Sequence, residues 1–283
     1  MPVNPQLPLS NPGPAITFIG GGNMARSLIG ALVRGGAQPA SIAVVEPNAD
    51  LRGTLARDFG IAVHERAEQT SGDADVIVLA VKPQVLKQVC LDLAPQVAQS
   101  RPLILSIAAG VRIAQLREWL GVELPIVRSM PNTPALIGAG ATGLIANAAA
   151  DEVRRAQAEA ILAAAGRTAW IEREELMDTV TALSGSGPAY FFLLAEALED
   201  AAVAQGLPRE TARALATQTC LGAGRMLVES GEAPATLRER VTSPGGTTAA
   251  ALDAFANGGL RELAAAAIDA AVVRGRELAA AQG

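Results

Sequence analysis

The sequence predicts an α/β protein of two domains, in which strands alternate with helices up to about residue 172 and only helices follow. Short apolar runs recur between segments with helical periodicity, which is typical of βαβ units and a mostly parallel sheet. A glycine-rich turn joins the first apolar run to the first helix. The chain has 283 residues, 50% of them apolar, which is enough for two cores of ordinary size.

Strand-like runs precede each helix of the first half. The run Asp75–Val81 is almost entirely apolar, as expected of a central strand covered on both faces. The predicted strands are Ile16–Gly20, Ile42–Glu46, Ile61–His64, Asp75–Val81, Leu103–Ala108, Ile126–Ser129 and Thr168–Ile171. The predicted helices are Met24–Arg34, Ala49–Asp58, Pro83–Leu93, Ile113–Leu120 and Asp151–Ala165.

The second half has helical periodicity throughout. Pro188, Pro208 and Pro234 suit the first turns of helices, where a missing N–H group costs little. The predicted helices are Glu174–Leu183, Pro188–Gln205, Arg209–Ser230, Pro234–Val241, Thr247–Ala256 and Leu260–Ala281. The predicted organisation is a disordered Pro-rich tail over 1–14, an α/β domain over 15–172 and a helical domain over 173–283, whose many apolar faces favour burial against another subunit.

The turn after the first strand has the spacing of a dinucleotide-binding fingerprint. Gly20 allows a tight turn, Gly22 leaves room for a pyrophosphate to approach the backbone, and Ala25 lets the helix pack closely on the sheet. The N–H groups at the helix start then face the phosphates. Glu46 follows the second strand at about the distance expected of the acid that holds an adenosine ribose. The first domain is therefore predicted to be a Rossmann-like dinucleotide-binding domain.

Composition excludes several classes of function. The longest apolar runs are too short to span a membrane, and no secretion signal is evident, so we expect a cytoplasmic protein without membrane partners. The net charge is −5 without a basic cluster, which argues against nucleic acid. Cys90 and Cys220 lack the spacing of a metal or redox site, so we expect reduced thiols and no metal.

The scarcity of Lys and His restricts the kinds of reduction that the protein could catalyse. The only lysines are Lys82 and Lys87, and the only histidine is His64, so the helical half contains neither residue type. Reduction of a ketone generally requires a proton donor such as His, Lys or Tyr beside the hydride path. The single tyrosine, Tyr190, lies in an apolar run that favours a core or an interface. A protonated imine would avoid this need, because it accepts hydride directly and gives a neutral amine.

A loop in the helical half could hold such a substrate. The segment Val241–Thr248 reads Val-Thr-Ser-Pro-Gly-Gly-Thr-Thr and leads directly into a helix. Its glycines allow open backbone N–H groups, and a helix N-terminus attracts an anion. Plain helix capping by Ser and Thr explains the same residues equally well. Two further turns, Met130–Pro134 and Ser184–Ala189, favour a binding site over capping.

These motifs together resemble the pyrroline-5-carboxylate reductase family, and the resemblance extends from Ala15 to the C-terminus. The matching motifs occur in order as Ile19-Gly-Gly-Gly-Asn-Met24, Ala80-Val-Lys-Pro83, Ser106-Ile-Ala-Ala-Gly110, Met130-Pro-Asn-Thr-Pro134, Ser184-Gly-Ser-Gly-Pro-Ala-Tyr190 and Thr242-Ser-Pro-Gly-Gly-Thr-Thr248. The last is the family's signature. The resemblance implies reduction of 1-pyrroline-5-carboxylate to L-proline, the last step of proline biosynthesis, with NADPH or NADH as cofactor. It also implies a homodimer through the helical domain, often assembled into decamers, with Ser184–Pro188 supporting the active site.

The resemblance also implies roles for individual residues. Thr248 matches the family hydroxyl that hydrogen-bonds the ring nitrogen, and is the candidate catalytic residue. The candidate substrate-binding residues are Ser243, Gly245, Gly246, Thr247 and Thr248. The candidate cofactor-binding residues are Ile19, Gly20, Gly21, Gly22, Asn23, Met24, Glu46, Ala80, Val81, Lys82, Pro83, Ala108, Ala109, Gly110 and Asn132.

Two departures from the family pattern concern the cofactor. Glu46 stands where many members have Ser, Asn or Arg, and its carboxylate would accept from ribose hydroxyls but repel a 2′-phosphate. Asn48 and Arg52 could soften that repulsion. Ala67 stands where many members have an Asn near the adenosine.

Two alternative functions remain open at this point. One is a β-hydroxyacid dehydrogenase, whose catalytic lysine would have to lie in a helical half that has no lysine. The other is a non-catalytic NAD(P)-binding redox sensor, which would bind cofactor without turning over an imine.

Overall fold

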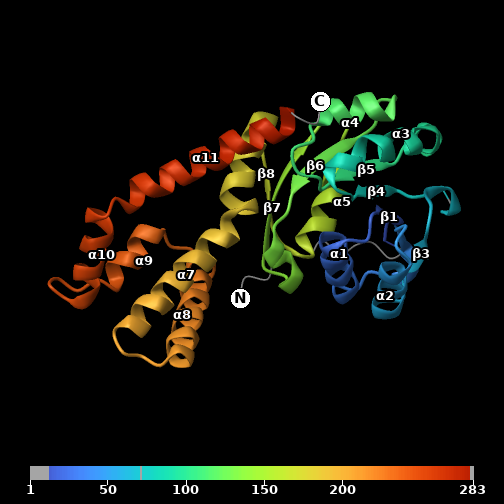
Figure 1. The fold of residues 1–283 in the computed structure, drawn as a ribbon. Coiled ribbons are helices and arrows are strands. Elements are labelled where there is room, and N and C mark those ends of the chain that lie inside the picture. The colour runs from blue at the N-terminus through green and yellow to red at the C-terminus, as the bar shows by residue number, and fades with distance from the viewer. Residues whose placement is uncertain (1–12, 71, 281–283) are drawn as a thin grey trace. The chain divides into compact units, whose positions relative to one another are not determined.

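The computed structural model describes residues 13–70 and 72–280 (Figure 1). The predicted disordered tail over 1–14 lies almost wholly outside the described residues. Two compact units are present: one contains the described residues up to Gly185 together with those from Ala271 onward, and the other contains Ser186–Ala270.

Within the described residues, eight strands form one sheet in the order β3-β2-β1-β4-β5-β6-β7-β8. All neighbouring strands are parallel except β6 and β7, which are antiparallel. The first six strands thus follow the order of a dinucleotide-binding sheet, with the topological switch between β1 and β4. The strands are β1 (Ile16–Ile19), β2 (Ile42–Val45), β3 (Ala62–His64), β4 (Val76–Leu79), β5 (Leu103–Ser106), β6 (Ile126–Met130), β7 (Gly140–Ala146) and β8 (Gly166–Trp170).

Helices cover both faces of the sheet. Alternate residues of each strand point to opposite faces, so Phe18 and Val78 pack on one side while Ile19 and Leu79 pack on the other. The first side is covered by α1 (Asn23–Arg34), α2 (Ala49–Phe59) and α5 (Glu152–Ala163), and the second by α3 (Pro83–Ser100) and α4 (Ile113–Leu120). Short 3₁₀ turns lie at η1 (Pro39–Ser41), η2 (Ala67–Gln69) and η3 (Thr133–Ile137).

Helix α3 is longer than predicted. It continues through Pro95 to Ser100, whereas the sequence pattern predicts an end at Leu93. A proline inside a helix removes one hydrogen bond. Val97, two residues after Pro95, is fully buried in the core, so packing offsets that loss.

Strand β7 was not predicted, although it is seven residues long. Its two glycines weaken the strand pattern, yet each is required by a close contact. A Cβ atom on Gly140 would lie 2.8 Å from the carbonyl oxygen of Ala165, and one on Gly143 would lie 2.6 Å from Cγ1 of Val180.

The segment after β8 belongs to the same compact unit as the sheet, up to Gly185. It consists of η4 (Glu174–Leu176), α6 (Met177–Val180) and a π-helical turn, η5 (Thr181–Gly185), where one helix over Glu174–Leu183 was predicted. Met177 is fully buried, and the carboxylate of Glu174 accepts from the buried Arg128 at 3.0 Å and from the Ile113 N–H at 2.8 Å.

The second unit is helical, as predicted. It contains α7 (Gly187–Ala204), α8 (Arg209–Glu229), α9 (Pro234–Arg240), α10 (Thr247–Asn257) and the first half of α11 (Leu260–Ala280). Among the described residues, no helix is both long and apolar enough to cross a bilayer.

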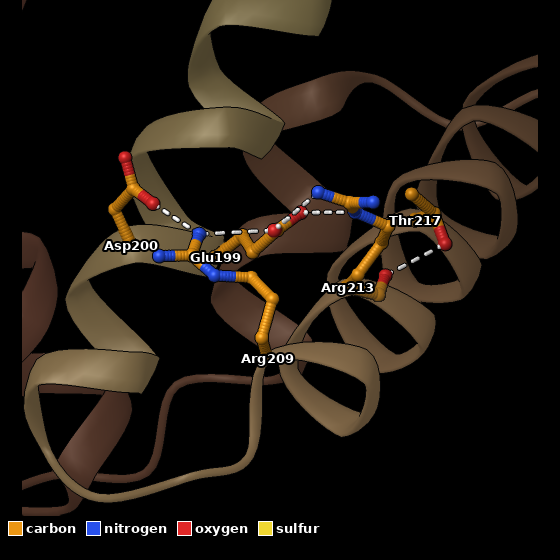
Figure 2. A network of polar contacts seen from close by, with 5 residues as sticks. All are labelled: Glu199, Asp200, Arg209, Arg213 and Thr217. Atoms are coloured by element: carbon orange, nitrogen blue, oxygen red, sulfur yellow. Dashed lines mark hydrogen bonds and ion pairs between the residues drawn. The ribbon is translucent and has the colours of Figure 1, made fainter.

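Helices α7 and α8 are joined by a carboxylate held between two guanidinium groups (Figure 2). Glu199 of α7 is only 8% exposed and accepts from Arg213 at 3.0 Å through each of its oxygens and from Arg209 at 3.0 Å. Arg209 also pairs with Asp200. Hydrogen bonds from Arg213 and then Arg209 hold the pKa of Glu199 below its ordinary value.

Candidate functional site

The glycine turn between β1 and α1 has the conformation that its sequence predicts. Gly20 has φ of +100°, and a Cβ atom there would lie 2.7 Å from the carbonyl oxygen of Ala80. Its N–H donates to the carbonyl of Val45 at 2.8 Å. Only glycine satisfies both the backbone angle and this close approach to the residue that follows β4.

The other two glycines of the turn differ from each other in their surroundings. A Cβ atom on Gly21 would lie 2.6 Å from Cδ1 of Leu55 and 3.3 Å from the Glu46 side chain, so Gly21 is required by packing inside the domain. Around Gly22 nothing lies within 4 Å of such an atom. The open side of the turn is therefore at Gly22, where the fingerprint places the approach of a pyrophosphate.

The start of α1 offers donors to an anion. Gly22 is the N-cap residue, and no side chain caps the helix. The first intrahelical bond is from the Arg26 N–H to the Gly22 carbonyl at 2.9 Å, so by helix geometry the N–H groups of Asn23, Met24 and Ala25 have no partner within the helix. This is the arrangement that binds phosphates. The side chains of Ile19 and Met24 pack into the core clusters on the two faces of the sheet.

The loops after β4 and β5 lie beside this turn, because their strands follow β1 in the sheet. The Ala80 N–H donates to the Ile19 carbonyl at 2.8 Å, and the Ile107 N–H donates to the Leu79 carbonyl at 3.2 Å. Lys82 is the N-cap residue of α3 without a side-chain cap bond. The segments Ala80–Pro83 and Ala108–Gly110 are thus brought to the same edge of the sheet as the glycine turn.

Glu46 is held firmly at the end of β2. Glu46 is 9% exposed, and its carboxylate accepts hydrogen bonds from two backbone groups, the Gly21 N–H and the Asn48 N–H, each at 2.9 Å. The Glu46 N–H donates to the His64 carbonyl at 2.9 Å. The contact with Gly21 joins the candidate ribose acid directly to the glycine turn, a link that the sequence spacing does not reveal.

Asn132, a candidate cofactor residue, uses its side chain inside the protein. Its amide nitrogen donates to the Ser184 carbonyl at 2.9 Å, and its oxygen accepts from the Ala141 N–H at 2.9 Å. The residue is 8% exposed. It ties the loop after β6 to β7 and to the π-helical turn, so it positions these backbones. The Ser184–Ala189 motif forms the end of that turn and the start of α7 where the sequence suggests an open turn.

The candidate substrate loop lies in the helical unit, before α10. Gly245 has φ of +69°, and the Gly246 N–H donates to the Ser243 carbonyl at 3.0 Å. Gly246 is the N-cap residue of α10, and no side chain caps that helix. The hydroxyls of Ser243, Thr247 and Thr248 therefore do not serve the capping role that was the alternative explanation. Ser243 is exposed and Thr248 is partly buried within the single chain.

Comparison with known proteins decides the family. A family model described as pyrroline-5-carboxylate reductase dimerisation matches residues 174–278, and one described as NADP oxidoreductase, coenzyme F420-dependent, matches residues 15–110. The chain is 50% identical over 266 residues to the pyrroline-5-carboxylate reductase of Pseudomonas aeruginosa. The matched region covers 94% of this chain and 97% of that relative. The chain belongs to the pyrroline-5-carboxylate reductase family.

Solved structures of the reductase family have the same fold. A pyrroline-5-carboxylate reductase from Coxiella burnetii has a TM-score of 0.91 and 44% identity, with 94% of this chain and 98% of that chain covered. The enzyme from Plasmodium falciparum, solved with NADP bound, has a TM-score of 0.82 and 29% identity, with 95% and 99% covered. The predicted fold class, with a helical dimerisation region after the parallel sheet, is confirmed by these matches.

The structure gives Arg52 a role other than the one expected from the sequence, and it adds Arg128, which the sequence motifs do not single out. Arg52 donates to the carbonyls of Glu46 and Pro47, at 2.8 and 2.7 Å, and so fixes the loop after β2. Arg128 holds Glu174, which anchors the segment that returns from β8. An arginine within an apolar strand is the signal that could have identified the second. Among the described residues, no three His, Cys, Asp or Glu side chains gather as a metal site.

Proposed function

We propose that this chain reduces 1-pyrroline-5-carboxylate to L-proline with NAD(P)H, as the last step of proline biosynthesis. The observation that carries the proposal is family membership over nearly the whole chain, from relatives 38–50% identical across 92–96% of it. The geometry supports it at two places: the glycine turn of the sheet unit, which is open at Gly22, and the uncapped N-terminus of α10.

The cofactor fits the residues at the carboxyl edge of the sheet. Open space at Gly22 and the donors at the start of α1 suit the pyrophosphate, and Glu46 suits the adenosine ribose. We assign cofactor binding to this edge, comprising Ile19, Gly20, Gly21, Gly22, Asn23, Met24, Glu46, Ala80, Val81, Lys82, Pro83, Ala108, Ala109, Gly110 and, through its backbone contacts, Asn132. When bound, the reduced nicotinamide supplies the hydride.

The loop before α10 is assigned to the substrate. The backbone N–H groups of Ser243, Gly245 and the first turn of α10, together with the positive end of the α10 dipole, would hold the substrate carboxylate. Thr247 adds a hydroxyl, and the Thr248 hydroxyl would hydrogen-bond the ring nitrogen. A protonated imine needs no further acid, because hydride addition to its carbon leaves a neutral secondary amine. This agrees with the absence of Lys and His from the helical half.

We further propose that the chain forms a homodimer through its helical region and that dimers assemble into decamers in the cytoplasm. Large apolar side chains on α7 and α8 are exposed in the single chain: Phe191, Phe192, Leu193, Leu194, Leu198, Leu215, Leu221, Met226, Leu227 and Val228. An exposed apolar surface of this extent favours burial against another subunit. Sedimentation equilibrium measures the assembly directly, and a monomer at micromolar concentration would contradict the proposal.

The activity is tested by following NADH and NADPH oxidation at 340 nm with 1-pyrroline-5-carboxylate and, separately, with a panel of hydroxyacids. We expect imine-dependent oxidation that yields proline in equal amount. Turnover of hydroxyacids alone would favour the dehydrogenase alternative, and cofactor binding without any turnover would favour the redox sensor.

A further inference from the structure

The segment after β2, residues 46–50, comprises a short loop and the start of α2, and it carries two acidic residues and no basic one. Glu46 begins it, and Asp50 lies in the first turn of α2. Pro47 has no N–H group to offer to a phosphate. The Asn48 side chain accepts from the Leu51 N–H at 3.0 Å and thereby caps α2. In a dinucleotide-binding sheet this loop lies at the adenosine ribose, so its charge acts on the 2′-position of the cofactor.

The Glu46 carboxylate is fixed in place and cannot easily turn away. It is held by the Gly21 and Asn48 N–H groups, each 2.9 Å away, while the Glu46 N–H is bonded to the neighbouring strand. Each carboxylate oxygen has a second lone pair and can accept another hydrogen bond. A ribose hydroxyl would donate to it in a charge-assisted bond, whereas a 2′-phosphate would meet a like charge.

The guanidinium groups of α1 and α2 nearest this segment are already engaged. Arg52 donates to the carbonyls of Glu46 and Pro47, and its other terminal nitrogen lies 3.5 Å from the Glu65 carboxylate. Only 20% of the Arg52 side chain is exposed. Arg26 of α1 is paired with Asp58 of α2. Neither guanidinium is therefore available to receive a phosphate without giving up a partner within the protein.

We propose that Glu46 makes this chain prefer NADH to NADPH. The inference rests on the proposed function only in that the cofactor is a nicotinamide dinucleotide. The preference comes from one fixed carboxylate that binds the 2′-hydroxyl and opposes the 2′-phosphate. Arg52 acts as a positioning residue, because it holds the backbone of the loop that carries Glu46.

The direct test measures affinity without turnover. NADH and NADPH are titrated separately into the full-length protein, with no imine present, and binding is followed by nicotinamide fluorescence. We expect NADH to bind at least about tenfold more tightly, since like charges at a binding site cost more than the 1.4 kcal/mol that a factor of ten represents. Equal affinities, or tighter binding of NADPH, would overturn the proposal.

A variant assigns the preference to one side chain. Glu46→Gln keeps the size and one accepting oxygen but removes the charge, so we expect the ratio of the two dissociation constants to shift at least about tenfold toward NADPH. Asp50→Asn removes an equal charge from the first turn of α2, four residues away, and should leave the ratio unchanged. If Asp50→Asn shifts the ratio as much as Glu46→Gln, the general charge of the loop determines the preference and Glu46 does not.

A test on the ligand needs no variant and covers the case in which Glu46→Gln fails to fold. The probes 5′-AMP and adenosine 2′,5′-bisphosphate compete with NADH on the wild-type protein, and 5′-AMP should compete better. Stronger competition by the bisphosphate would contradict the inference. If neither NADH nor NADPH supports reduction of the imine, the proposed function is rejected, whereas the cofactor preference is still decided by the measured affinities.

Discussion

Alanine substitutions at Gly20 and Gly22, the two outer glycines of the turn after β1, should affect different properties: the first stability and the second cofactor binding. At Gly20 the backbone has φ of +100°, and a Cβ atom would lie 2.7 Å from the Ala80 carbonyl oxygen. Left-handed backbone costs an L-residue roughly 1–2 kcal/mol, and overpacking costs about 1–3 kcal/mol more. Gly20→Ala should therefore lower the free energy of unfolding by roughly 2–5 kcal/mol.

Gly22→Ala should leave stability nearly unchanged and weaken cofactor binding. The backbone angles there, φ −66° and ψ −176°, suit any residue, and no atom lies within 4 Å of the added carbon. The free energy of unfolding should stay within about 1 kcal/mol of wild type. The methyl group would occupy space that the pyrophosphate needs, at a cost of about 1–3 kcal/mol, or about 5- to 150-fold in the dissociation constant.

Urea unfolding followed by circular dichroism measures the first quantity, and fluorescence titration with NADH measures the second. The reasoning fails if Gly22→Ala binds NADH as wild type does, because the open space would then not be the pyrophosphate path. It also fails if Gly20→Ala is as stable as wild type, because the contact with Ala80 would then be relieved at no cost.

Three further outcomes are expected. Thr248→Ala should lower kcat/KM for the imine by about 10²-fold or more, with an unchanged dissociation constant for NADH. Thr248→Ser keeps a hydroxyl and should retain most of the wild-type rate. Equal losses in both variants would exclude a role for the hydroxyl. The pKa of Glu199 is lowered in the folded state by Arg213 and Arg209, so its stabilisation is present above the ordinary value of 4.5 and is lost as pH falls through the lower folded value. Glu199→Gln should therefore flatten the acid side of the urea-midpoint profile, and a profile that keeps the wild-type slope would refute this. Burial raises the pKa of Cys90 to about 12, so in a Cys220→Ser variant, which removes the exposed thiol, Cys90 should resist Ellman's reagent at pH 8 until denaturant is added. Rapid reaction of that variant in its folded state would contradict the burial of Cys90.

Strands with continuous apolar runs could be predicted from the sequence, whereas β7, whose glycines are required by contacts with distant residues, could not. The runs of β1, β2, β4 and β5 are almost uninterrupted because both faces of those strands are buried. Strand β7 has glycines where Ala165 and Val180 approach, and no local pattern reveals contacts with residues so distant in the sequence. The extension of α3 past Pro95 likewise depends on a tertiary contact.

In the candidate site too, features fixed by local sequence could be predicted and features that depend on distant contacts could not. The positions of Gly20, Gly22 and Glu46 follow from spacing, because a short turn and a strand end fix them locally. The hydrogen bond from Gly21 to the Glu46 carboxylate depends on how β1 and β2 align, which spacing alone does not specify. The roles of Asn132 also depend on distant partners, since its side chain bonds β7 and the π-helical turn.

Because β7 runs antiparallel to β6, the segment that leads from β8 back to Asn132 must have a particular length. Because β7 and β8 run opposite to β6, β8 ends at the edge of the sheet away from the glycine turn, and α6 with the π-helical turn leads back to Asn132. A π-helix accommodates one residue more per hydrogen-bonded turn than an α-helix. The turn over Thr181–Gly185 thus behaves as a one-residue insertion that brings the Ser184 carbonyl into register with Asn132. Deletions here should consequently be tolerated far less well than in surface loops of equal length.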